Sequence, residues 1–151
     1  MNRYEIALDY FRQNYNCCQS VLLAFREEIA LDEQKALDIA GGYGSGAGTG
    51  ELCGAINGGI MALGLLTPID KAEPFKSKRR TMALAKELQE RFRARFTHVR
   101  CGDLLRDMVG FVPTDDTPVA KAMGLSKHCE IMMVTAVELV EQILAEREAE
   151  E

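Results

Sequence analysis

The segment from Gly41 to Leu66, GGYGSGAGTGELCGAINGGIMALGLL, decides how this chain folds, because it holds ten of the 13 glycines. Up to Gly50 a glycine stands at nearly every second residue, which is typical of a loop that needs positive φ angles or a close backbone approach. From Glu51 onward the segment becomes apolar. We expect a helix of about four turns there, ending near Gly64 and closed by Pro68.

The glycines inside this expected helix indicate that another backbone passes very close to it. Each glycine in a helix interior costs roughly 1 kcal/mol against alanine, so its presence needs a reason. Gly54 and Gly58 lie one turn apart, and Ala55 with Gly59 forms a second pair of small residues. A phosphate-binding loop is the alternative, but the segment lacks the P-loop lysine and no strand precedes it.

The rest of the chain has the spacing of amphipathic helices. We expect helices over 4–13, 17–29, 32–41, 51–64, 75–97, 101–107, 117–124 and from 126 onward. No stretch alternates with a period of two, and hairpin signals are absent. We therefore predict an all-α fold, a single-domain bundle of about six to eight helices over residues 1–151, with a tail that frays from about residue 147.

A surplus of positive charge follows the glycine-rich segment. Residues 71–100 hold ten of the 18 lysines and arginines against three glutamates, a formal charge of +7. The apolar stripe of the helix expected over 75–97 consists of Met82, Ala85, Leu88, Phe92 and Phe96. The basic side of this helix is either a solvated face or a docking surface for an acidic partner.

The overall composition excludes several classes of protein. A net charge of −5 argues against general nucleic-acid binding. The N-terminus lacks the apolar core of a signal peptide, and the longest apolar run is short and glycine-rich, so we expect no membrane insertion. The expected compartment is the cytoplasm, where structural disulfides are rare, so five cysteines indicate metal or redox chemistry.

Four cysteines share one position in the predicted elements. Cys17, Cys53, Cys101 and Cys129 each fall in the first turn of an expected helix, and no pair has CxxC spacing. Helix starts favour a thiolate, since their free N–H groups and dipole stabilise negative charge. We expect the four thiols to meet at one pocket, with Cys53 the most nucleophilic and its pKa lowered. The alternative is that cysteine is merely a small apolar residue at these helix ends.

Three further residues have open roles. Cys18 points some 100° away from Cys17 around the helix, as either a core residue or a resolving thiol. His98 stands three residues before Cys101, so an unbroken helix would make it a ligand or base for that thiol. His128 directly precedes Cys129 and is expected to point elsewhere. Both histidines also fit as surface or capping residues.

The motifs together resemble a known family. Asn16-Cys17-Cys18-Gln19, the segment GELCGAING over 50–58, Cys101 and Cys129 resemble the C-GCAxxG-C-C family of redox-active proteins, over about residues 10–144. The resemblance implies a helical fold and a redox role, with Cys17, Cys53, Cys101 and Cys129 as the hallmark cysteines. Cys18 departs from the family pattern, because it stands where alanine is expected.

These observations leave the chemistry open between three readings. The four cysteines serve thiol/disulfide or electron-transfer chemistry with a redox partner protein, or they bind a metal or an iron–sulfur cluster together with His98. In the third reading the chain is a non-catalytic helical binding module. The basic helix and the acidic C-terminal tail also predict a homodimer. Whether the chain is an enzyme stays open.

Overall fold

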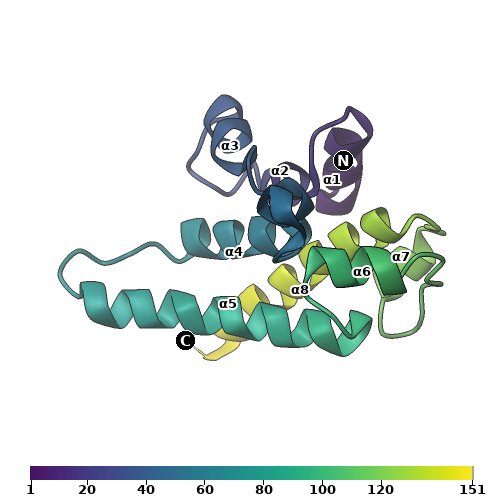
Figure 1. Ribbon diagram of the computed structural model, residues 1–151. Helices are drawn as coiled ribbons and strands as arrows, with labels where there is room; N and C mark the ends of the chain where they lie inside the picture. Colours follow the sequence, from purple (N-terminus) through teal and green to yellow (C-terminus); the bar gives the residue numbers. More distant parts are fainter. Residues whose placement is uncertain (151) are drawn as a thin grey trace.

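The computed structural model describes residues 1–150, which form an all-α fold (Figure 1). The elements are α1 (Arg3–Arg12), α2 (Cys17–Leu23), α3 (Glu33–Ala40), the single π-helical turn η1 (Gly46–Gly50), α4 (Gly54–Leu66), α5 (Pro74–Phe96), α6 (Cys101–Asp107), α7 (Pro118–Ala122) and α8 (His128–Glu150). Within these 150 residues there is no strand, only one isolated antiparallel bridge between Leu52 and Arg100. The expected fold class is confirmed.

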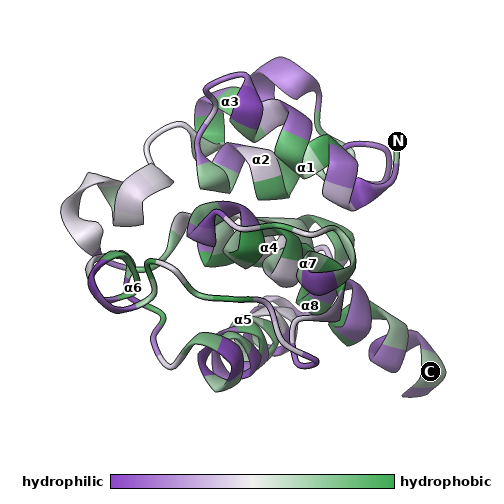
Figure 2. Ribbon diagram, turned by 90° about the vertical axis from the view of Figure 1, so that its right-hand side faces the viewer, coloured by the Kyte–Doolittle hydropathy of each residue, from purple (hydrophilic) through white to green (hydrophobic). Residues whose placement is uncertain are grey.

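Helix α4 lies at the centre of the molecule. It packs against α2 on one side and against α5 and α8 on another, and Figure 2 shows it between the layer of α1 to α3 and helix α5. A Cβ atom on Gly58 would stand 2.5 Å from the carbonyl oxygen of Cys18, and one on Gly59 would stand 2.7 Å from Leu88 Cδ2. The glycines therefore allow close packing on two faces, as their spacing in the sequence predicted.

Side-chain caps start two of the helices where they were expected. The Asn16 side chain accepts from the Gln19 N–H, and the Gln19 side chain accepts in return from the Asn16 N–H. Asp32 caps α3 with a single bond, in which its side chain accepts from the Lys35 N–H. Helix α2 ends at Leu23, however, and not near residue 29, because the hydrogen bonds that follow tighten to i→i−3 turns.

The two longest helices are α5 and α8, and the first of them corrects one expectation. Met82 is exposed to 62% and does not belong to the buried stripe of α5, while Leu88 and Phe92 do. Helix α8 extends through Glu150, and the fraying expected from about residue 147 stays a prediction. Glu146 of α8, which directly precedes the acidic tail, is paired with Arg91 of α5, and the expected homodimer stays a prediction.

None of the helices in residues 1–150 is both long enough and apolar enough to cross a lipid bilayer.

Candidate functional site

Four cysteines that are far apart in the sequence line one small pocket. Its lining residues are Cys17 of α2, Cys53, Gly54 and Ala55 at the start of α4, Cys101, Leu104 and Leu105 of α6, and His128, Cys129 and Met132 of α8. The free space inside is about 30 Å³, which is the volume of about one water molecule. The expected convergence of the four helix starts is therefore present, whereas the chemical roles of the thiols stay a prediction.

The glycine-rich loop and a short bridge bring α4 and α6 together. Three glycines of the η1 turn have positive φ angles of 62°, 76° and 74°, at Gly46, Gly48 and Gly50. The chain then pairs with the segment before α6. The N–H of Cys53 donates to the carbonyl oxygen of Val99 at 2.9 Å, and the N–H of Cys101 donates to that of Glu51 at 2.6 Å. These two bonds fix the starts of α4 and α6 side by side.

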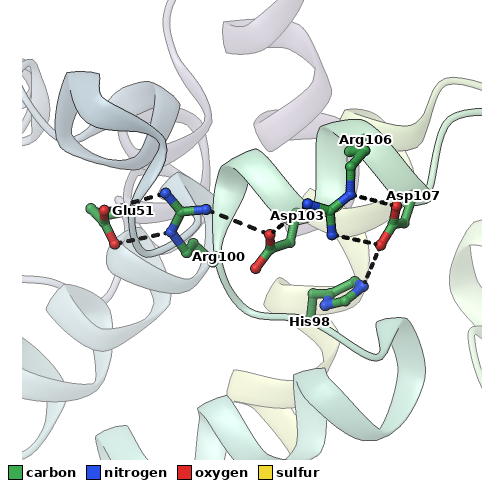
Figure 3. Close-up of polar contacts among 6 residues, drawn as sticks. All are labelled: Glu51, His98, Arg100, Asp103, Arg106 and Asp107. Atoms are coloured by element: carbon green, nitrogen blue, oxygen red, sulfur yellow. Dashed lines mark hydrogen bonds and ion pairs between the residues drawn. The ribbon is translucent and has the colours of Figure 1, made fainter.

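A chain of ion pairs runs along the exposed side of α6 (Figure 3). The Arg100 guanidinium lies 3.2 Å from the Glu51 carboxylate. This ion pair connects the same two segments that the backbone bridge connects, but at the surface. Arg106 and then His98 lower the pKa of Asp107 to about 2 by pairing with its carboxylate. This network borders the pocket without entering it.

His98 belongs to this surface network and not to the pocket. Its Nε2 lies 2.9 Å from the Asp107 carboxylate. Thr97 has a φ of 72° and ends α5, so His98 and Cys101 do not lie on one continuous helix face. The expectation that His98 serves the Cys101 thiol as ligand or base is therefore wrong.

Cys53 differs from its predicted state. It is the N-cap residue of α4, one position before the first turn, and its side chain is only 6% exposed. Burial, reinforced by the charge of Cys17, raises the pKa of the Cys53 thiol to about 12. The N–H groups of Ile56 and Ala55 act in the opposite direction, as the helix-start argument requires, but they are outweighed by desolvation. The expectations of a lowered pKa and of an open thiol are therefore wrong.

The other three pocket thiols also have raised pKa values. Burial raises the pKa of Cys17, against the N–H groups of Ser45, Cys17 itself and Cys18. Burial and then the charges of Cys17 and Cys101 raise the pKa of Cys129 to about 11. Burial also raises the pKa of the Cys101 thiol, but the charge of Arg100 opposes this shift. A charge on Cys17 or Cys101 would thus disfavour a second thiolate in the pocket.

Cys18 lies outside the lining of the pocket. It is fully buried, with its Sγ 3.7 Å from the Met61 Sδ, and burial raises its pKa to about 12. Of the two roles left open for this residue, its surroundings match the core residue.

His128 is the functional candidate that sequence reasoning placed wrongly. It lines the pocket, and its Nε2 is buried without a hydrogen-bond partner among the described residues. Adjacent residues in a helical interior point about 100° apart, which is why His128 was expected to face away from Cys129. Both residues stand at the very start of α8, however, where the helix end borders the pocket. The sequence did contain a signal for this position, because His128 is a polar residue directly beside a cysteine that was expected in the first turn of a helix.

The arrangement of these donors is not that of a site for a single metal ion. Within residues 1–150, no group of three or more histidine, cysteine, aspartate or glutamate side chains is disposed to hold one. All five cysteines are free thiols. In this form the pocket offers uncombined sulfurs to a redox reaction.

Comparison with known proteins agrees with the motifs. The family model described as "putative redox-active protein (C_GCAxxG_C_C)" matches residues 15–143 and so includes all four pocket cysteines. No curated protein and no solved structure matches the chain. Because the match covers most of the chain, this protein belongs to the C_GCAxxG_C_C family of putative redox-active proteins.

Proposed function

We propose that the pocket is a thiol redox centre, in which two cysteines are oxidised to a disulfide while a disulfide of a partner protein is reduced. The observation that carries this proposal is that four free thiols from four different helix starts line one pocket. In the balanced step, two thiols of the pocket lose two protons and two electrons and form one S–S bond. The partner disulfide accepts both electrons and both protons and becomes two thiols.

Cys101 is the thiol that meets the partner in this proposal. It is partly exposed, it stands at the start of α6, and the Arg100 guanidinium favours its thiolate. Its sulfur attacks the partner disulfide and displaces one partner thiolate, which takes up a proton. A second pocket thiol, which we assign to Cys17 because it lines the same pocket, then attacks the Cys101 sulfur and displaces the remaining partner thiolate, which takes up a proton. A reducing compartment such as the cytoplasm would return the pocket to its thiol form.

An iron–sulfur cluster is the second candidate, and a specific observation favours it. The four sulfurs that line the pocket come from four different helix starts, and His128 Nε2 is buried there without a hydrogen-bond partner among the described residues. Cysteine thiolates are the usual ligands of such clusters, which supply one-electron transfer when bound. Cys17, Cys53, Cys101 and Cys129 would hold the cluster, and N–H groups at their helix starts would stabilise its negative charge.

One preparation distinguishes the two candidates. The protein is purified without oxygen, its iron and acid-labile sulfide are measured, and its free thiols are counted before and after treatment with a small disulfide. Thiol cycling predicts no metal and the reversible loss of two thiols, which Cys101→Ser abolishes and Cys18→Ala leaves unchanged. Iron and sulfide that disappear in Cys101→Ser would replace the first candidate by the second. A protein with neither metal nor oxidisable thiols would be a binding module.

A further inference from the structure

The connection between α4 and α5 forms a fixed, projecting tip, which we define as residues 65–82. Figure 1 shows this connection at one extremity of the molecule. Arg80 reaches back over the loop and donates to the carbonyl oxygen of Thr67 at 3.1 Å. The buried Ser77 hydroxyl accepts from the N–H of Asp70 at 3.2 Å. These bonds tie the loop to the first turns of α5, so the tip has a defined shape.

Large apolar side chains are exposed on this tip although the fold around it is well bonded. The exposed fractions are 38% for Leu65, 52% for Ile69, 65% for Phe75 and 62% for Met82. Single exposed apolar residues are ordinary, but four within one short segment indicate a surface that contacts something apolar.

The same tip concentrates positive charge in an acidic protein. Residues 65–82 contain five lysines and arginines against Asp70 and Glu73, a formal charge of +3 (5 − 2), while the whole chain carries −5. Lys78 Nζ and the Arg79 guanidinium carbon lie 5.6 Å and 5.7 Å from the centroid of the Phe75 ring. The exposed ring and its flanking cations therefore project together from the first two turns of α5.

We propose that this tip binds the surface of an anionic lipid bilayer. Phe75 then enters the interface between head groups and acyl chains, while Lys78 and Arg79 pair with lipid phosphates. An exposed aromatic ring flanked by flexible cations is suited to that boundary, because the stems of the cations stay in apolar surroundings and their charged ends stay in water. An acidic protein would match the cations but would leave the exposed apolar side chains without a role.

The geometry of α4 makes such binding compatible with the thiol pocket. Cys53 stands before the first turn of α4 and Leu65 near its last, so about 18 Å of helix separates the pocket from the tip. A protein held by the tip keeps the pocket at a distance from the bilayer, open to a partner in the aqueous phase. The contact is peripheral and does not depend on which chemistry the pocket performs.

Vesicle flotation tests the proposal. Full-length protein is mixed at low salt with vesicles of phosphatidylcholine alone or with about one third phosphatidylglycerol, a surface that attracts clustered lysines and arginines. We expect flotation with the anionic vesicles alone and a loss of about tenfold or more in affinity for Lys78→Glu/Arg79→Glu. Phe75→Ser should also weaken binding. The matched controls are Lys35→Glu/Lys127→Glu, which changes the charge equally at exposed sites elsewhere, and Val112→Ser, which removes an equally exposed apolar side chain.

Each of the other outcomes overturns the proposal. Absence of flotation at low salt excludes the bilayer as the partner, and equal losses in the control variants reduce the effect to net charge. Binding to a soluble acidic polypeptide that outcompetes anionic vesicles and is insensitive to Phe75→Ser would assign the tip to an acidic protein. Far-ultraviolet circular dichroism and melting temperature confirm that each variant is folded, since all substituted side chains are exposed.

Discussion

The pocket has two unlike walls, although each is built from a cysteine at a helix start. The α4 wall, Cys53 with Gly54 and Ala55, is closed: Cys53 is 6% exposed and its pKa is raised to about 12 by burial. The α6 wall, Cys101 with its neighbours Leu104 and Leu105, borders solvent, and Leu105 is 47% exposed. The comparison teaches that a helix start alone does not activate a thiol. Burial of the sulfur outweighs the helix start in setting the Cys53 pKa, and we expect the reactivity of the two thiols to follow their burial.

The largest expected effect of this difference is on alkylation. A shift of the Cys53 pKa from 9.0 to about 12 lowers its thiolate fraction at neutral pH by about a thousandfold. We therefore expect Cys101 to react with iodoacetamide at least about a hundredfold faster than Cys53, since only the thiolate is a good nucleophile. The measurement is limiting alkylation of reduced, metal-free protein followed by peptide mapping. In denaturant the two rates should become similar, and faster labelling of Cys53 in the native protein would mean that the α4 wall opens.

A smaller effect comes from breaking the packing that closes the α4 wall. A methyl group at Gly58 would meet the carbonyl oxygen of Cys18 at 2.5 Å, and backbone cannot swing aside as a flexible side chain does. Gly58→Ala should therefore destabilise the fold by roughly 1–3 kcal/mol and speed alkylation of Cys53. Gly42→Ala is the matched control, because nothing lies within 4 Å of its added Cβ atom.

Chemical denaturation measures the free energy of unfolding of both variants. Gly42→Ala should stay within about 0.5 kcal/mol of the parent protein. Equal stability of Gly58→Ala and Gly42→Ala would show that α2 and α4 are less tightly packed than the structure indicates, and the account of the closed wall would fail with it.

These walls also show which parts of the site can be predicted from sequence. The caps at Asn16 and Asp32 and the small face of Gly54 and Gly58 are local patterns with local causes, so they were foreseen. Cys53 lies just before α4 and directly after the bridge between Leu52 and Arg100, whose partners are 48 residues apart in the sequence (100 − 52). No helical periodicity carries that information.

The misplaced histidines have the same kind of cause. His98 looked suited to Cys101 only on the assumption of a continuous helix, and a single residue with positive φ, Thr97, removed that face. His128 lines the pocket because three other helices, α2, α4 and α6, meet at the start of α8. Spacing within one segment predicts which residues begin helices, but not which helix ends meet.

A third prediction concerns the stability of the reduced protein at high pH, which depends on the raised pKa values of its buried thiols. Burial raises the pKa of Cys18 and Cys53 to about 12 and that of Cys129, with help from neighbouring thiols, to about 11. Such thiols stay protonated in the folded state while the unfolded chain loses their protons near pH 9, so their contribution is complete below that pH and is lost as pH rises toward about 12. The melting temperature of reduced protein should fall over this window.

Cys18, which lies outside the pocket, provides a control for this effect of pH on stability. Cys18→Ala should flatten the decline because it removes one of the most strongly shifted thiols. An equally steep decline in that variant would show that Cys18 does not contribute to the pH dependence.

The smallest expected effect concerns the charge beside the α6 wall. Arg100 is exposed and shared between Glu51 and Asp103, so water and its carboxylate partners weaken its field at Cys101. We expect Arg100→Ala to slow alkylation of Cys101 only about twofold to fivefold near neutral pH, and high salt to reduce the difference further. Arg100→Lys keeps the charge and should restore most of the rate.

Arg106→Ala is the comparison for that variant, since Arg106 pairs with Asp103 and Asp107 but does not contribute to the pKa of Cys101. If both arginine variants slow the reaction equally, the cause is a general change in the charge of the α6 surface. If neither does, the reactivity of Cys101 rests on its exposure alone. The difference between the two walls of the pocket is then entirely a difference in burial, and the charged network of Figure 3 serves only to hold the glycine-rich loop against α6.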